Sequence, residues 1–132
     1  DKVIKEYDSK GYIDLYTGFR CYGPMSRNQV INYHIQGTAF HCLLWTFIQV
    51  SRILEARKMQ SKLIGQIHDA LILDIDPEEE SRVDHIIELY GTKKIRETWP
   101  WIAVPLQMEK SVSEISGNWA EMKEEKILGE IV

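Results

Sequence analysis

The pattern of apolar and polar positions changes from strand-like to helical within the first half of the chain. Between residues 11 and 22, two short aromatic and β-branched segments flank Thr17-Gly18, which predicts a hairpin. The polar residues 1–10 before it fit the tail of a helix. From about Asn28 to Met59 the pattern predicts a long helix, with Gly37 inside it as a point of close approach. Its apolar face is formed by Leu43, Leu44, Phe47, Ile48 and Leu54.

The segment from Lys62 to Ile75 predicts a second hairpin. Its apolar residues show no helical phase and surround the polar tip formed by residues 68–70. The sequence Asp76-Pro77-Glu78 then has the N-cap, the proline and the acids of a helix start. The face of this helix is apolar, and Gly91 is a candidate interruption of it. The apolar positions are Val83, Ile86, Ile87 and Tyr90.

After a turn at residues 99–101, the stretch from Val104 to Val112 predicts a strand, and residues 117–119 open a final short helix. The order of hairpin, long helix, hairpin, helix, strand and helix indicates an α+β fold in which helices back an antiparallel sheet. Because no repeat or linker divides the chain, we expect residues 1–132 to form a single unit.

Composition narrows the class of protein. With 132 residues, 44% apolar and 27% charged, the chain has the composition of one globular domain. It contains no apolar run of about 18 residues, so we expect a cytoplasmic protein with no membrane partner. The net charge of −4 argues against an independent nucleic-acid binder, so other segments would have to supply most of the attraction to DNA. Cys21 and Cys42 lack zinc-ligand spacing and are expected to be buried thiols.

Asp69 is the main candidate for chemistry. A carboxylate at the tip of an apolar hairpin has a rigid base and faces outward, as a metal ligand requires, but aspartate is also a common turn residue. His68, taken alone, fits a packed or surface histidine. Asn32 and Gln36 lie four residues apart, so on a helix they share a face and their amides can reach base edges. An ordinary solvated polar face is the alternative.

Two further groups are assigned no chemistry. Residues 78–80 are all glutamate and are expected to be a solvated helix start. Trp99, Trp101 and Trp119 are expected in the core, with base stacking as the alternative.

Several segments resemble the family A (polymerase I-like) DNA polymerases in collinear order. Residues 31–39, Ile-Asn-Tyr-His-Ile-Gln-Gly-Thr-Ala, resemble the family signature Asn-x-x-(apolar)-Gln-Gly-Thr-Ala. Residues 66–70, Gln-Ile-His-Asp-Ala, resemble motif C, an apolar residue followed by His-Asp-Glu. Residues 11–20 resemble the family's Gly-Tyr…Gly-Arg-Arg hairpin, and residues 104–119 its Val-Pro-Leu…Glu…Asn-Trp ending.

The resemblance implies the C-terminal part of a polymerase palm that adds nucleotides to a primer 3′ end. It implies that Asp69 helps to hold two magnesium ions and that His68 lies near the primer terminus. Asn32 and Gln36 match residues that contact template and primer in the minor groove. The substrates of the intact enzyme would be DNA primer-template and deoxynucleoside triphosphates. The residues that this resemblance assigns to DNA contact are Asn32, Gln36, His68, Arg27 and Gln66.

Three positions depart from the family pattern. Ala70 stands where the family has Glu, so one carboxylate near the metals is absent. Phe19 replaces the first Arg of Gly-Arg-Arg, and Asn28 replaces an Arg, although Arg27 is adjacent. The stretch between Pro24 and Asn32 is short for cellular polymerases, which favours a phage enzyme.

The family's motif A, with the other essential aspartate, and its triphosphate-binding fingers helix are not found in the sequence. The resemblance therefore implies a fragment of a larger or split polymerase that is inactive alone and need hold no magnesium by itself. Its partners would be the remaining motif A, fingers and thumb segments, in a bacterial or phage-infected cell. Exposed apolar surface is expected where those partners bind, and self-association is another way to cover it. The alternatives are a non-catalytic palm-like module that binds DNA or protein, and a structural α+β domain whose matches are accidental.

Overall fold

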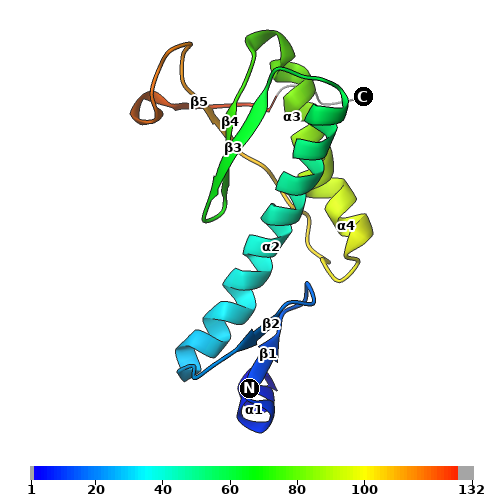
Figure 1. Ribbon diagram of the computed structural model, residues 1–132, viewed down its shortest axis with the longest axis vertical. Helices are drawn as coiled ribbons and strands as arrows, with labels where there is room; N and C mark the ends of the chain where they lie inside the picture. Colours follow the sequence, from blue (N-terminus) through cyan, green and yellow to red (C-terminus); the bar gives the residue numbers. More distant parts are fainter. Residues whose placement is uncertain (1, 128–132) are drawn as a thin grey trace.

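One long helix organises the protein. The computed structural model describes residues 2–127 (Figure 1). The elements in chain order are α1 (Lys2–Lys10), β1 (Tyr12–Asp14), β2 (Arg20–Tyr22), α2 (Arg27–Ala56), β3 (Lys62–Ile67), β4 (Ala70–Asp74), the 3₁₀ turn η1 (Pro77–Glu79), α3 (Glu80–Glu88), the π-helical η2 (Leu89–Lys94), α4 (Ile95–Thr98), β5 (Lys110–Val112), the 3₁₀ turn η3 (Trp119–Glu121) and β6 (Lys123–Glu125).

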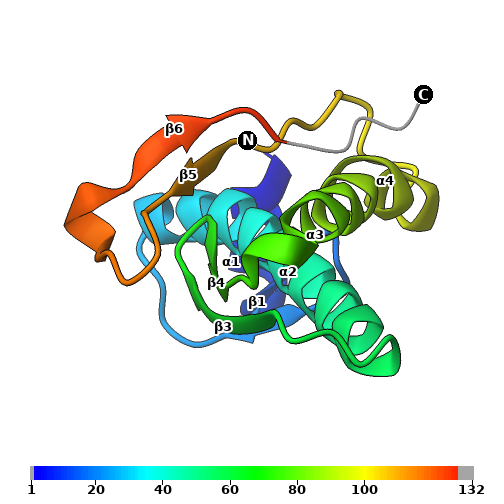
Figure 2. The same cartoon turned by 90° about the horizontal axis from the view of Figure 1, so that it is seen from above.

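The α+β class is confirmed, and the strands form three separate antiparallel pairs, β1–β2, β3–β4 and β5–β6. Figure 1 shows β1–β2 and α1 at the start of α2, and β3–β4 with α3 at its end. Seen from above in Figure 2, α3 lies beside α2, and the β5–β6 pair lies at the edge of the molecule. The helices α2 and α3 therefore back a hairpin, and among the described residues no pair joins another into a wider sheet.

Local signals explain where α2 begins. Ser26 and Gln29 form a reciprocal capping box, in which each side chain accepts a hydrogen bond from the other residue's backbone N–H. Inside the helix, a Cβ atom at Gly37 would lie 2.8 Å from Leu15 Cδ1. The predicted close approach at Gly37 is therefore made by a side chain of the segment that follows β1.

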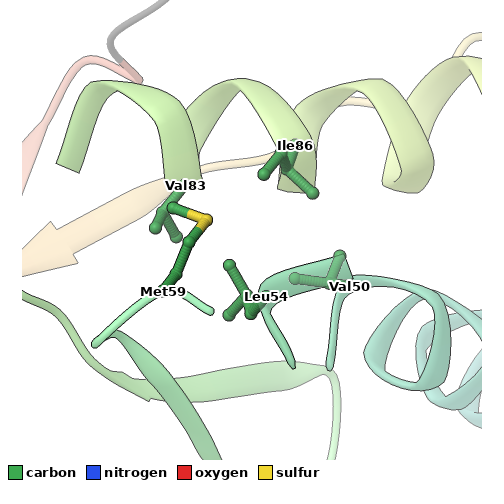
Figure 3. Packing of buried hydrophobic residues seen from close by; sticks show 5 residues of the cluster. All are labelled: Val50, Leu54, Met59, Val83 and Ile86. Atoms are coloured by element: carbon green, nitrogen blue, oxygen red, sulfur yellow. The ribbon is translucent and has the colours of Figure 1, made fainter. Parts of the chain in front are cut away.

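Two hydrophobic clusters lie at opposite ends of α2. Ile13, Leu15 and Val30 form the N-terminal cluster, onto which α1 and Cys21 pack. The C-terminal cluster joins α2 to α3 (Figure 3). Its members are Val50, Leu54, Met59, Val83 and Ile86. The same helix therefore contributes to both cores.

The thiols differ from expectation. Cys21 and Cys42 are free and half-buried, not fully buried. Partial burial raises the pKa of both thiols, because a low-dielectric environment disfavours the thiolate.

The predicted strand over residues 104–112 is shorter in the structure, where only β5 pairs, with β6. Pro105 has no N–H group to donate to a ladder, which explains part of this difference. At Gly91 the helical backbone continues, but α3 has ended at Glu88 and the segment with Gly91 is the π-helical η2, so the α-helical hydrogen bonding is interrupted there. A Cβ atom at Gly91 would lie 3.1 Å from the sulfur of Met108, so the glycine lets the later chain approach.

The expectation of a solvated acidic helix start is wrong for two of its three residues. Glu79 is only 8% exposed, and its carboxylate accepts hydrogen bonds from the backbone N–H groups of Gln60 and Ser61 and from the Ser61 hydroxyl. Glu80 accepts a hydrogen bond from Lys110 Nζ at 2.6 Å. Only Glu78 has the predicted exposed side chain. The side chains of Glu79 and Glu80 are less exposed because they bind partners that are distant in the sequence.

The tryptophans are less buried than predicted. Trp99 is half-buried between Trp45 and Trp101. Trp101 and Trp119 are 40% and 57% exposed, so the core prediction is wrong for them. No helix in the described part of the chain is long and apolar enough to span a bilayer.

Candidate nucleic-acid and metal site

The tip of the β3–β4 hairpin is a two-residue turn made by His68 and Asp69. The strands pair up to Ile67 and Ala70, which leaves these two residues as the connection. His68 adopts a left-handed backbone with φ of 52°, a region where histidine is among the better tolerated non-glycine residues. Both side chains are exposed. The Asp69 carboxylate is therefore accessible to a metal ion or a ligand.

The base of the same hairpin is held by apolar packing. Leu63 and Leu73 lie opposite each other and pack against the C-terminal cluster. The register shifts between Leu63 and Gly65, so Ile64 is an extra, bulged residue that is 64% exposed. A bulge increases local twist, which turns the outer part of the hairpin relative to its base.

Asn32 and Gln36 are both exposed on α2 and lie one helical turn apart, so the predicted shared face exists. Phe40 continues this row one turn further and is 42% exposed. Arg27, the first residue of α2, is also exposed. It lies about 20 Å along the helix from Phe40, at 1.5 Å per residue.

Gln66 brings the hairpin and this helix face together. Its Nε2 donates a hydrogen bond to the backbone oxygen of Phe40 at 3.3 Å. Gln36 lies about 6 Å along the helix from Phe40, and Asp69 lies about 10 Å along the strand direction from Gln66. Figure 1 shows the hairpin tip pointing along α2 towards its N-terminal half. The tip, Gln66 and Gln36 thus occupy one region, with Asn32 a further turn away, and Arg27 lies outside it.

The described residues do not complete a metal site. No three histidine, cysteine, aspartate or glutamate side chains between residues 2 and 127 come together as a possible ligand group. Magnesium prefers octahedral oxygen coordination and is usually bound through one or two carboxylates together with substrate phosphates and water. Asp69 supplies a single carboxylate, and the next residue, Ala70, supplies none.

Sequence reasoning missed two histidines that contact the β1–β2 turn. His41 Nδ1 lies 2.9 Å from the Thr17 hydroxyl, and the His34 ring lies 4.7 Å from the ring of Tyr16. Their seven-residue spacing places them on one face of α2, two turns apart, and this was the available signal. These contacts attach the hairpin turn to the helix.

Comparisons with known proteins agree on one family. The model for DNA polymerase family A matches residues 3–121. DNA polymerase I of Lactococcus lactis subsp. lactis (strain IL1403) is 27% identical over 134 residues, which cover 93% of this chain and 14% of that protein. DNA polymerase I of Geobacillus stearothermophilus is 28% identical over 120 residues, which cover 83% of this chain and 13% of that protein. The chain thus spans a small part of these relatives' length.

A solved structure shows the same fold. The POL domain of Pol1 from M. smegmatis, in complex with DNA primer-template and dNTP, matches with a TM-score of 0.65 at 20% sequence identity. The match covers 80% of this chain and 20% of that domain's chain.

Proposed function

The chain belongs to DNA polymerase family A, and we propose that it forms the C-terminal palm portion of a template-directed DNA polymerase. One observation supports this proposal: the hydrogen bond from Gln66 to Phe40 joins the hairpin that ends at Asp69 to α2, one helical turn from Gln36. A polymerase needs this combination, because a carboxylate at the reacting phosphate must be held in register with contacts to the primer-template.

The proposed roles follow from exposure and side-chain chemistry. Asp69 would be one magnesium ligand, and His68 would lie beside the primer end. Asn32 and Gln36 would donate and accept hydrogen bonds in the minor groove, where acceptors are similar for all base pairs, so contact there is largely independent of sequence. Arg27 is outside this group and would contact phosphate, since its guanidinium is a fixed cation at the helix start.

The remainder of the site would come from another segment. Family A polymerases generally use magnesium, and the described residues contain no group of three potential ligand side chains, so Asp69 would be one ligand of an incomplete set. A second aspartate and a triphosphate-binding surface are therefore required from motif A and the fingers. We expect this chain to be inactive alone and to act in the cytoplasm of a bacterial or phage-infected cell.

Exposed apolar side chains support this dependence on a partner. On α2 the exposed residues include Tyr33, Ile35 and Ile48, and on β3 they include Ile64 and Ile67. Burial of such a surface is favourable, so the rest of the polymerase is expected to cover it. Self-association of the isolated chain is the alternative, and sedimentation over a range of concentrations distinguishes the two.

The deciding experiment is primer extension with magnesium and all four deoxynucleoside triphosphates. The chain is assayed alone and with the upstream polypeptide of its own locus. Activity is expected only in the mixture, and Asp69→Ala should reduce it by at least about a thousandfold, the scale of an essential catalytic group. Asp74→Ala is the matched control, because Asp74 is an exposed aspartate at the other end of β4.

A non-catalytic palm-like module that holds DNA or protein is the second candidate, and the single carboxylate at the tip is the observation that favours it. It predicts primer-template binding by the mixture without extension, unaffected by Asp69→Ala. Extension that survives Asp69→Ala would contradict the assigned role of Asp69.

A further inference from the structure

The β3–β4 hairpin is attached to α2 in two chemically different ways. At its base, Leu63 and Leu73 pack against the C-terminal cluster. Nearer the tip, the hydrogen bond from Gln66 Nε2 to Phe40 O is the one side-chain hydrogen bond that joins the hairpin to α2 within residues 2–127. The four residues beyond it, from Ile67 to Ala70, are all exposed.

The chemistry of this contact fixes the orientation of the amide. The Phe40 carbonyl can only accept a hydrogen bond, so the NH₂ group of Gln66 must face it. The other end of the amide, Oε1, is then buried and has no hydrogen-bond partner among the described residues. A buried acceptor without a donor opposes folding. Stability alone would therefore favour an apolar side chain at this half-buried position, so the glutamine serves a purpose other than stability.

The position of the bond suggests that explanation. From Leu63 to the tip, the hairpin extends about 15 Å beyond the residues that pack against the C-terminal cluster, at about 3.3 Å per residue. A two-stranded ribbon is marginally stable by itself and bends easily. A bond at Gln66, two residues before the turn, restrains this ribbon close to its free end.

We propose that Gln66 is a positioning residue, whose hydrogen bond to Phe40 holds the His68-Asp69 tip at a set distance from the Asn32–Gln36 face of α2. Gln66 thus acts through the hairpin tip, a role separate from the DNA contact that the family resemblance assigns to it. The importance of that distance for catalysis rests on the proposed function. The restraint on the tip is a property of this chain and is tested without DNA.

The test measures backbone motion by ¹⁵N relaxation in the 15.4 kDa chain. Gln66→Leu removes the donor and the unpaired acceptor, and Gln66→Glu keeps the length but replaces the donor with a carboxylate. In both variants the order parameters of His68, Asp69 and Ala70 should fall from about 0.85 to below about 0.6. The Tm of Gln66→Leu should equal or exceed that of the parent chain, because a buried unpaired acceptor has been removed.

Gln107→Leu is the control, since it makes the same chemical change at an exposed position outside the hairpin. Gln107→Leu should leave the order parameters of His68, Asp69 and Ala70 unchanged. A tip as rigid in Gln66→Leu as in the parent chain would overturn the proposal. A loss of order throughout the C-terminal cluster with a lowered Tm would also overturn it, because that result indicates an ordinary structural role.

Primer extension by the mixture then adds a second readout. A misplaced tip should lower kcat about tenfold or more and leave the KM for primer-template nearly unchanged, because the contacts from α2 remain. A loosened tip without any extension by the parent mixture would contradict the proposed function and leave the positioning role established. A lowered kcat with a rigid tip would contradict the positioning role only.

Discussion

At the scale of single residues, the hairpin tip combines exposure with backbone strain. His68 has a positive φ, although its side chain is exposed and gains no packing from that conformation. Strained positions of this kind persist where surrounding structure imposes them, and they cluster at functional sites. Here the two-residue turn between Ile67 and Ala70 imposes the conformation.

Replacing His68 by glycine should therefore stabilise the fold. The left-handed region costs a residue with a Cβ about 1–2 kcal/mol, and glycine loses about 0.5–1 kcal/mol in chain entropy, so the net gain is up to about 1.5 kcal/mol. Thermal unfolding of His68→Gly should show a raised Tm. As a control, Ser81→Gly at an exposed position of α3 should lower it. An unchanged or lowered Tm for His68→Gly would show that the turn is not strained.

At the scale of elements, a buried carboxylate fixes the connection between α2, β3 and α3. Glu79 in η1 accepts hydrogen bonds from the Ser61 hydroxyl and from the backbone of residues 60 and 61, just before β3. The Ser61 hydroxyl in turn accepts a hydrogen bond from the Asp76 N–H. The Ser61 hydroxyl and these backbone groups hold the pKa of the Glu79 carboxyl below its ordinary value of 4.5.

This shift has a defined effect on stability. Because the folded state favours the carboxylate, the contribution of Glu79 is fully present above pH 4.5 and is lost as the pH falls through the lower folded pKa. Glu79→Gln should lower Tm by several degrees at pH 7, and the difference from the parent chain should shrink below pH 4.5. Glu78→Gln is the control in the same turn, and its Tm should follow the parent chain. A pH-independent difference for Glu79→Gln would rule out this role of the charge.

At the scale of the whole molecule, two small cores share one helix and a row of aromatic side chains. Tyr16, in the β1–β2 turn, lies 5.3 Å from Trp101, which follows α4. Trp99 continues the row to Trp45 on α2. These rings join the N-terminal hairpin to the C-terminal helices. They should therefore couple local unfolding of the N-terminal cluster to that of the C-terminal cluster.

Trp101→Ala should weaken this coupling. An aromatic pair contributes about 0.5–1.5 kcal/mol, so amide exchange in β1 and β2 should accelerate about two- to tenfold. Exchange in α3 should change much less. Trp119→Ala is the control, because Trp119 is exposed and has no aromatic partner among the described residues. Equal acceleration in all elements would show that the protein opens as one unit.

Sequence patterns were sufficient where the deciding interactions are local. The helical spacing of apolar residues after Asn28, the run of apolar residues in the second hairpin and the Asp76-Pro77 helix start all depend on neighbours within a few residues. These interactions placed the two hairpins and the long helix close to where they occur. The collinear motifs likewise indicated the polymerase family, which the family match confirms.

The sequence by itself thus determined the main elements, the family and the location of Asp69 at a hairpin tip. Only the tertiary structure decided that Glu79 is buried, that the strand after Pro105 is short and that Gln66 bonds to Phe40. The physical reason is that the burial of Glu79, the pairing of β5 with β6 and the Gln66 bond each depend on a partner 11 or more residues away, such as Phe40 for Gln66. A periodic pattern records which face of an element is apolar, but it contains no information on which distant donor or acceptor will meet that face.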